Sequence, residues 1–377
     1  MKVAIVLDSL VRGGAERQAL CALGELTRQS RDVELLYYNV AEFAYPPDFG
    51  GGGKVTHVEK RGQYLRFLGR LARKFRQERY DVVHGFMPGS SIYGGLAGWF
   101  ARIPVVFGGI RAEYDMSGLA RMGHRVVNRL ATGWIVNSQA TVRSMLPAIG
   151  ATPDRIHVVY NGIDPDAFRS NLSKAESKRK LGLDEAALVI TVLARLETQK
   201  NIPLFLGAAE QVHRVRPDAR FLIAGEGSLR GELEERSRTL GLDRIVQFLG
   251  NRPDVADILK ATDVLALTST YEGLSNTILE AMSVGLPVVS TAYRGIEELM
   301  NDGQEGFIVP LGDCAGLVQR FLQLLDDEGL RLRMGAAGKK TVANRFTISS
   351  MATRLYQVYE NAYVRVSGQR PAEAQVA

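Results

Sequence analysis

Short apolar runs alternate with longer amphipathic stretches along this chain of 377 residues. The apolar runs have the length of buried strands. They fall at 2–7, 33–38, 55–58, 81–84, 104–107, 134–137 and 157–160, and then at 188–194, 220–224, 246–249, 264–268, 287–291 and 306–309. Stretches with helical periodicity lie between them, at 15–27, 64–79, 90–100, 140–149, 203–215, 229–240, 255–260, 276–284, 316–325 and 329–344. This alternation predicts parallel sheets covered by helices on both faces.

The pattern is interrupted between the two halves. Asn161-Gly162 and Asp164-Pro165 favour turns, and the chain beyond them is polar and rich in lysine. We therefore expect two doubly wound α/β domains of the Rossmann type, at residues 1–165 and 183–346, with a linker at roughly 161–182. A final amphipathic pattern predicts a helix at 347–366, and 368–377 has the composition of a frayed end. Ligands bind such sheets at the carboxyl ends of the strands, so the loops after the strands are the candidate sites.

Composition narrows the class of protein. Hydrophobic residues make up 46% and charged residues 23% of the chain, as in an ordinary globular protein. The segment nearest to a membrane span, 92–110, is interrupted by Arg102 and Pro104. Cys21 and Cys314 fit no metal or redox spacing, and the first apolar run is too short for a signal peptide. We expect a cytosolic protein with reduced thiols.

The net charge of +6 arises almost entirely from one segment, 54–79, which holds nine basic and two acidic residues. From Gly62 to Arg79, arginines alternate with apolar residues in a helical pattern. Two interpretations are compatible: a packed domain helix with a solvated basic face, and a helix that lies against an anionic membrane. Nucleic-acid binding is disfavoured, because no stacking platform or known module accompanies the charge.

Glu272 and Glu280 stand eight positions apart around the start of a predicted helix. A helix N-terminus attracts an anion, and a carboxylate on each side can accept hydrogen bonds from hydroxyls. This arrangement suits a nucleoside diphosphate sugar, with ribose at Glu280 and the sugar at Glu272. The residues expected to line the phosphates are Gly273, Leu274, Ser275, Asn276 and Thr277.

Cations follow other strands. Arg195 and Lys200 come after 188–194, and two fixed cations can neutralise a diphosphate leaving group without a divalent metal. Arg294 adds a third cation near the phosphates or the acceptor, or it merely precedes a helix cap at Gly295.

The loop after the first strand contains Gly13 and Gly14, with Arg12 and Arg17 beside them. Glycines at a helix entry let backbone approach a ligand closely. The spacing is not G-x-G-x-x-G, which argues against a plain dinucleotide site.

His84 ends the strand 81–84, so we expect it at the sheet edge, in a catalytic, substrate-contacting or structural role. Asp164-Pro165-Asp166 has the spacing of a D-x-D metal motif, but its position favours a turn. We expect no required metal and no cofactor, since a nucleotide sugar is a substrate.

Together these motifs resemble the retaining glycosyltransferase family 4, which has the GT-B fold. The resemblance implies that Arg195 and Lys200 grip the donor diphosphate, Glu280 binds ribose and Glu272 holds the donor sugar. It also implies that Gly14 lets the first loop approach the donor, that the last helix crosses back to the first domain, and that the domains close over the donor. The segments that carry it are 13–17 (GGAER), 161–164 (NGID), 195–200 (RLETQK), 224–227 (AGEG), 272–280 (EGLSNTILE) and 305–310 (EGFIVP).

The chain departs from the family on the acceptor side. Many members carry a histidine after the strand that matches 104–107, whereas this chain reads Gly108-Gly109-Ile110-Arg111-Ala112-Glu113. Arg111 and Glu113 are the candidates for that role.

We expect a retaining, metal-independent hexosyltransferase that uses a UDP- or GDP-linked sugar. The expected acceptor is the hydroxyl of a lipid-linked saccharide, in the synthesis of a surface polysaccharide such as lipopolysaccharide or exopolysaccharide, or of a glycolipid. The protein would be cytoplasmic and peripheral at the inner face of the cytoplasmic membrane. The alternatives are a GT-B-type nucleotide-sugar epimerase and a non-catalytic protein that binds a membrane surface or a partner.

Overall fold

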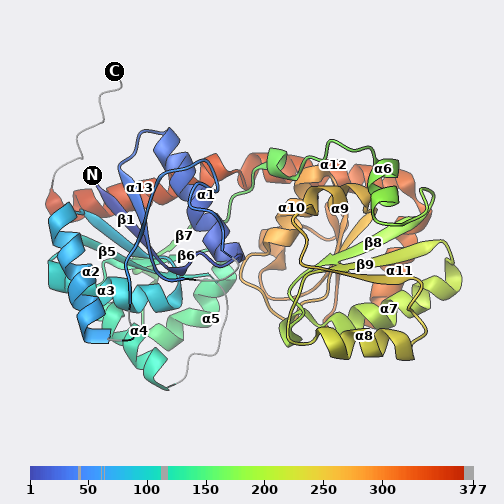
Figure 1. Cartoon of the computed structure of the whole chain (residues 1–377), viewed down its shortest axis with the longest axis horizontal. Coiled ribbons are helices and arrows are strands. Elements are labelled where there is room, and N and C mark those ends of the chain that lie inside the picture. The colour runs from blue at the N-terminus through green and yellow to red at the C-terminus, as the bar shows by residue number, and fades with distance from the viewer. Residues whose placement is uncertain (41–43, 61, 63, 112–117, 369–377) are drawn as a thin grey trace. The chain divides into compact units, whose positions relative to one another are not determined.

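The computed structural model describes residues 1–40, 44–60, 62, 64–111 and 118–368. They form two compact units, shown in Figure 1. Unit 1 comprises Met1–Gly162 and the chain from Thr347 onward, and unit 2 comprises Ile163–Phe346. The predicted fold class is confirmed, since each unit is a parallel α/β sheet. The expected linker does not stand apart from the domains, because the chain belongs to unit 2 from Ile163 onward.

The described part of unit 1 contains a seven-stranded parallel sheet in the order β3-β2-β1-β4-β5-β6-β7. Its strands are β1 (Val3–Ser9), β2 (Val33–Asn39), β3 (Lys54–His57), β4 (Val82–Gly85), β5 (Val105–Ile110), β6 (Gly133–Val136) and β7 (Ile156–Val158). Its helices are α1 (Gly14–Arg28), α2 (Tyr64–Glu78), α3 (Pro88–Ala101), α4 (Gly118–Leu130), α5 (Gln139–Ile149), the 3-10 turn η1 (Pro153–Arg155) and α13 (Ile348–Ser367).

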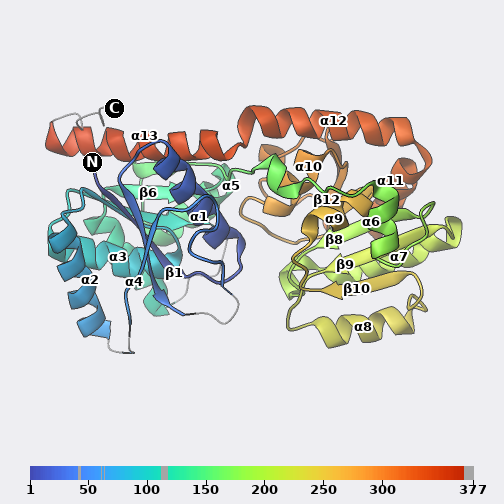
Figure 2. The same cartoon turned by 45° about the horizontal axis from the view of Figure 1, so that its top comes forward.

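Side-chain alternation along the strands divides the core of unit 1 between the two faces of the sheet. Val3 and Ile5 of β1 belong to the cluster that packs against α1 and α13. Ala4 and Val6 belong to the cluster that packs against α2 and α3. Figure 2 shows α13 beside α1 on the same side of the sheet. The last helix thus completes the core of the unit in which the chain begins.

The described part of unit 2 contains a six-stranded parallel sheet in the order β10-β9-β8-β11-β12-β13. Its strands are β8 (Leu188–Leu193), β9 (Ala219–Ala224), β10 (Val246–Gly250), β11 (Val264–Leu267), β12 (Val288–Thr291) and β13 (Gly306–Val309). Its α-helices are α6 (Lys174–Lys180), α7 (Ile202–Val215), α8 (Arg230–Thr239), α9 (Val255–Ala261), α10 (Asn276–Val284), α11 (Cys314–Asp326) and α12 (Glu328–Arg345). Short 3-10 turns are η2 (Pro165–Phe168), η3 (Thr198–Lys200) and η4 (Ile296–Glu298).

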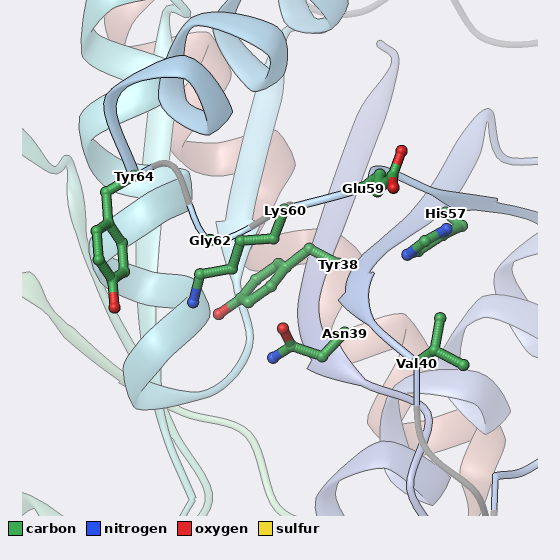
Figure 3. A pocket seen from close by; sticks show the side chains of 8 residues that line it. All are labelled: Tyr38, Asn39, Val40, His57, Glu59, Lys60, Gly62 and Tyr64. Carbon is green, nitrogen blue, oxygen red and sulfur yellow. The ribbon is translucent and has the colours of Figure 1, made fainter.

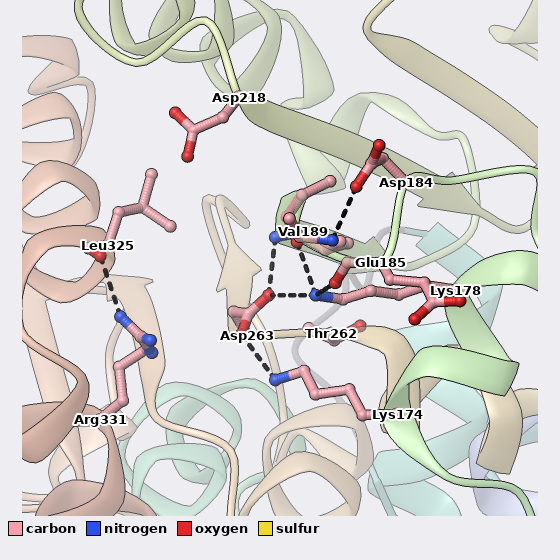
Figure 4. Close-up of polar contacts among 12 residues, drawn as sticks. Lys174, Lys178, Asp184, Glu185, Val189, Asp218, Thr262, Asp263, Leu325 and Arg331 are labelled. Atoms are coloured by element: carbon pink, nitrogen blue, oxygen red, sulfur yellow. Dashed lines mark hydrogen bonds and ion pairs between the residues drawn. The ribbon is translucent and has the colours of Figure 1, made fainter.

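Helix α6 lies within the segment expected as a linker and is tied to the sheet by a buried lysine. Lys178 donates to the carbonyl oxygens of Glu185 at 3.0 Å and Ala187 at 2.6 Å, and its Nζ lies 3.8 Å from Asp263 Oδ2 (Figure 4). Lys174 pairs with the same carboxylate at 2.6 Å. The backbone N–H of Val189, in β8, donates to Asp263 Oδ2 at 2.8 Å. These contacts explain why α6 folds as part of unit 2.

Candidate functional site

Three neighbouring strands of unit 2 end in the loops that hold the sequence-predicted donor residues. Arg195 and Lys200 follow β8, the segment 272–277 follows β11, and Arg294 follows β12. Since β11 pairs with both β8 and β12, these loops leave the same edge of the sheet side by side. The structure therefore places most of the predicted site along one sheet edge, the usual ligand position in such folds.

Lys200 and Glu272 form an ion pair that joins the first two loops. The side chains are only 15% and 10% exposed, so solvent screens the pair weakly. Ser269 Oγ donates to the same carboxylate oxygen of Glu272 at 2.6 Å. The cation and the carboxylate therefore occupy fixed positions next to each other.

Backbone contacts hold the same two loops together. Thr268 Oγ1 donates to the carbonyl oxygen of Lys200 at 2.8 Å. The N–H of Thr270 donates to the carbonyl oxygen of Gln199 at 2.9 Å, and Gln199 Nε2 donates to that of Tyr271 at 2.6 Å. The position of Lys200 relative to Glu272 is therefore set by several bonds in addition to the ion pair.

The start of α10 lies in the second of these loops. Ser275 is the N-cap, and its Oγ accepts a hydrogen bond from the N–H of Ile278 at 3.4 Å. Thr277 Oγ1 donates to the carbonyl oxygen of Leu193 at 3.2 Å, which ties the helix to the end of β8. Glu280 is one turn further and is buried. The helix end carries partial positive charge, so an anion is favoured between Glu272 and Glu280.

Arg195 is exposed, and no carboxylate within the described ranges lies within 4.0 Å of its guanidinium. Hydrogen bonds from Ser228 lower the pKa of the neighbouring Glu197, and the charge of Arg195 adds to this effect. Gly225 and Gly227 pack so closely on Ala194 and Leu196 that a Cβ at either position would collide with backbone. The glycines of the segment 224–227 thus let the loop after β9 support the loop that carries Arg195.

Tyr293, which the sequence analysis did not single out, belongs to this edge. It follows β12, its side chain is fully buried, and no described residue forms a hydrogen bond with its hydroxyl. Burial raises the pKa of this hydroxyl, and the Glu272 charge raises it further. The sequence signal was its position, immediately before Arg294 in a loop that follows a strand.

In unit 1, Gly13 is the N-cap of α1 and Gly14 is its first residue. A Cβ on Gly13 would collide with the Glu16 carboxylate, which lies against this turn. A larger residue at Gly13 would have to displace this flexible carboxylate, and the close approach of Gly14 to a donor stays a prediction.

The side chain of His84 does not point to the sheet edge as expected, and of the roles left open by the sequence it fits the structural one. His84 shares the face of Val82, which packs against α13, and its side chain is fully buried. Its Nδ1 is 2.7 Å from the hydroxyl of Tyr359, in α13. Burial lowers the pKa of His84 well below its usual value, and the Arg111 charge contributes. The strand ends one residue later than expected, at Gly85, and strand alternation turns the side chain of His84 toward the helix.

Arg111, just after β5, is buried with its guanidinium over the ring of Phe86 at 3.7 Å from the centroid. Its Nε and Nη1 are buried and have no hydrogen-bond partner within the described ranges, which omit the six residues that follow. Burial lowers its pKa to about 10. Unpaired guanidinium N–H groups are costly unless an acceptor reaches them. The other candidate for this role, Glu113, lies outside the described residues.

The Asp164-Pro165-Asp166 segment forms a turn, as expected. Asp164 caps η2, and its Oδ1 accepts a hydrogen bond from the N–H of Asp166 at 3.0 Å. In the described part of the chain, no group of three or more His, Cys, Asp and Glu side chains is arranged to hold a metal ion. Across the same residues, no helix combines the length and apolarity needed to cross a bilayer.

Comparison with known proteins agrees with this geometry. Residues 173–341 match the family described as Glycosyl transferases group 1, and residues 12–167 match the family described as Glycosyltransferase Family 4. The chain belongs to glycosyltransferase family 4. The predicted family is thereby confirmed.

This glycosyltransferase is similar in sequence to two bacterial relatives. It is 29% identical over 312 residues to the UDP-Gal:α-D-GlcNAc-diphosphoundecaprenol α-1,3-galactosyltransferase of Escherichia coli, covering 78% of this chain and 79% of the relative. It is 30% identical over 263 residues to the lipopolysaccharide core biosynthesis mannosyltransferase LpsB of Rhizobium meliloti, covering 64% and 74%.

Solved structures show the fold of the glycosyltransferase. Anabaena HepE, crystallised with UDP-glucose, aligns with a TM-score of 0.82 at 22% identity over 96% of this chain and all of the other. The sucrose-phosphate synthase of Thermosynechococcus elongatus aligns with a TM-score of 0.78 at 17% identity over 97% of this chain and all of the other. These neighbours confirm the predicted GT-B fold.

Proposed function

We propose that this glycosyltransferase moves a hexose from a UDP- or GDP-linked donor to an acceptor hydroxyl, with retention at the anomeric carbon and without a metal ion. The observation that carries the proposal is the Lys200–Glu272 pair beside the start of α10. It sets a cation, a carboxylate and a helix N-terminus along one sheet edge, next to Arg195. A UDP-linked donor is supported by the name of the Escherichia coli relative and by the HepE complex.

Departure of the nucleoside diphosphate builds negative charge on the β-phosphate oxygen and positive charge on the anomeric carbon. Arg195 and Lys200 stabilise the phosphate charge together with the N-terminus of α10, and preorganised charges of this kind need little rearrangement during reaction. Glu272 accepts hydrogen bonds from the sugar hydroxyls, and its charge favours the developing positive carbon. Glu280 accepts the ribose hydroxyls, and Arg294 adds a cation at the same edge.

The acceptor side lies in unit 1, where Arg111 is our candidate for the role of the missing histidine. Its Nε and Nη1 donors, which have no partner among the residues that the structure describes, suit an oxygen of the acceptor. His84 is buried beneath α13 and acts in the proposal only as support for Tyr359.

We infer a lipid-linked saccharide as the acceptor class, in the synthesis of a surface polysaccharide or glycolipid. The two relatives support it, since one is named for a diphosphoundecaprenol-linked sugar and the other for lipopolysaccharide core. The basic helix α2 supports peripheral contact with an anionic membrane at its cytoplasmic face. It packs on the core through residues such as Phe67 and Phe75, yet leaves Leu65 and several arginines exposed.

The proposal is tested first by thermal denaturation with a panel of UDP- and GDP-linked hexoses. A bound donor stabilises the fold by mass action, by about 3 kcal/mol at one hundred times its dissociation constant. We expect at least one donor to raise the Tm of the wild type and Lys200→Ala to abolish that rise. The matched control is Lys260→Ala, an exposed lysine of α9, which should keep it.

Transfer is then measured with the stabilising donor and a lipid-linked saccharide acceptor, in the presence of EDTA. Product that requires acceptor, survives the chelator and keeps the anomeric configuration of the donor supports the proposal. Epimerised sugar nucleotide formed from donor alone would instead identify an epimerase. If no member of the panel changes the Tm, the donor site is wrongly assigned.

A further inference from the structure

A pocket of about 470 Å³ lies in unit 1, apart from the residues assigned so far. Tyr38 and Asn39 contribute from the carboxyl end of β2, Lys60 from the connection after β3, and Tyr64 from the first residue of α2. It thus lies at the carboxyl ends of the strands, where α/β proteins bind ligands. Its volume suits one sugar residue with a substituent.

Lys60 is unusual in this pocket because its ammonium lies among three aromatic rings. Its Nζ lies 5.2 Å from the ring centroid of Tyr38, 5.3 Å from that of Tyr64 and 4.6 Å from that of Tyr93. Figure 3 shows its ammonium between Tyr38 and Tyr64, while the carboxylate of Glu59 points away. Across the part of the chain that the structure describes, no carboxylate comes within 4.0 Å of this ammonium.

The rings around Lys60 are held in place from behind. Tyr38 donates a hydrogen bond to the carboxylate of Asp8, at the end of β1. Tyr93, in α3, meets Tyr38 edge-on at 5.4 Å and Phe67 at 5.3 Å. Asp8 also accepts hydrogen bonds from Ser90, and burial raises its pKa, while the charge of Lys60 acts in the opposite direction from a distance. The cation therefore sits in a preorganised aromatic surround.

The chemistry of the pocket defines a ligand. Aromatic faces attract an ammonium but accept none of its hydrogen bonds well, so its three N–H donors suit the oxygens of an anion. The Tyr64 ring, 62% exposed, offers an apolar face to the C–H side of a pyranose. The exposed Asn39 amide can donate to and accept from hydroxyls.

We propose that this pocket binds the acceptor, which is a saccharide carrying an anionic group, through pairing of that group with Lys60 and packing of the sugar on Tyr64. The inference rests on the proposed transfer reaction and names the chemistry of its acceptor. A phosphate supplied by a lipid-linked saccharide and one supplied by a free sugar phosphate would satisfy the pocket equally.

The test uses saturation-transfer NMR titrations of the full-length protein. The probes are the 1-phosphates of glucose, galactose, mannose and N-acetylglucosamine, each paired with its uncharged methyl glycoside. We expect the wild type to bind at least one phosphate about tenfold more tightly than its methyl glycoside, as befits a charge-assisted hydrogen bond. Lys60→Met should remove this preference, whereas Tyr64→Ala should weaken both members of the pair.

Arg73→Met is the matched control, since it removes an exposed positive charge of α2 that does not line the pocket. It should bind like the wild type. Equal affinity of the wild type for all phosphates and their glycosides, or retention of the preference in Lys60→Met, would overturn the inference. Loss of binding to phosphatidylglycerol vesicles in Lys60→Met, with sugar-phosphate binding intact, would also overturn it, by showing a lipid-surface contact.

The donor-induced Tm rise is measured on the same variants. Lys60→Met and Tyr64→Ala should retain it, because neither residue belongs to unit 2. If a donor raises the Tm of the wild type but the wild type does not prefer sugar phosphates, the acceptor pocket alone is refuted. If no donor raises the Tm of the wild type, the transferase proposal is refuted. Where sugar phosphates bind, adding a vesicle-embedded, diphosphate-linked saccharide as competitor distinguishes the two phosphate sources.

Discussion

Glu34 shows how one buried carboxylate can stabilise unit 1. It lies in β2 with its side chain 1% exposed, and Lys54, Lys74, Thr56 and Tyr80 surround it. Burial alone would raise its pKa, but the hydrogen bonds from these neighbours outweigh burial and lower the pKa to about 2. The folded state therefore favours the ionised carboxylate.

The free energy of unfolding should consequently fall as the pH drops from about 4.5 toward 2. A depressed folded-state pKa contributes stability that is fully present above the unfolded-state value and is lost as protonation proceeds. The loss amounts to about 3 kcal/mol for this group. Denaturant unfolding of Glu34→Gln across this pH range should lack that component, while Glu232→Gln, at an exposed site, should behave like the wild type. Parallel pH profiles for all three proteins would contradict the assignment.

Tyr293 illustrates a conflict between stability and site chemistry at a single residue. Its hydroxyl is buried with no partner in the part of the chain that the structure describes, an arrangement that costs about 1–3 kcal/mol. Tyr293→Phe should therefore raise the Tm slightly, while it lowers kcat for transfer because the hydroxyl beside the Glu272 charge is gone. Unchanged kcat in a stabilised variant would show that the hydroxyl has no part in the reaction.

At the scale of elements, the buried contacts of Lys178 attach α6 to unit 2. Burial lowers the pKa of Lys178, yet its ammonium is held by two carbonyl oxygens and by Asp263. Removing one partner of a buried pair costs about 3 kcal/mol. Lys178→Met should lose about this much in urea unfolding, whereas Lys174→Met, at a lysine 44% exposed, should lose less than about 1 kcal/mol. Equal losses of unfolding free energy in the two variants would mean that the hydrogen bonds from Lys178 to the carbonyl oxygens do not contribute to stability.

Elements differ in how clearly the sequence predicts them. The strands of both sheets were predictable, because buried parallel strands are nearly continuous apolar runs. Helix α4 was missed although its sequence is amphipathic, and its apolar residues Leu119, Met122 and Val126 lie exposed rather than in the core. Helix α6 was missed because its lysines look solvated in sequence, although Lys178 is buried.

At the scale of the whole molecule, the order of strands and helices along the chain was enough to predict the fold and the approximate positions of the donor loops. Loops that follow adjacent parallel strands must meet at one edge, so Lys200 and Glu272 could be placed near each other from sequence. Their ion pair, the orientation of His84 and the aromatic surround of Lys60 could not be placed in this way. Each depends on which side of a strand or helix a side chain takes and on neighbours remote in sequence.

The return of the chain to unit 1 has a consequence for the order of synthesis. Leu355 and Tyr359 of α13 are fully buried in the core cluster of unit 1, but they are translated after all of unit 2. Translation proceeds at 5–20 residues per second, so synthesis of the intervening residues takes on the order of ten seconds or more. During this time, the face of the first sheet that α13 later covers stays exposed. Unit 2, by contrast, is contiguous and can complete its core first. We therefore expect the nascent first unit, rather than unit 2, to be the part of this protein that binds chaperones on the ribosome.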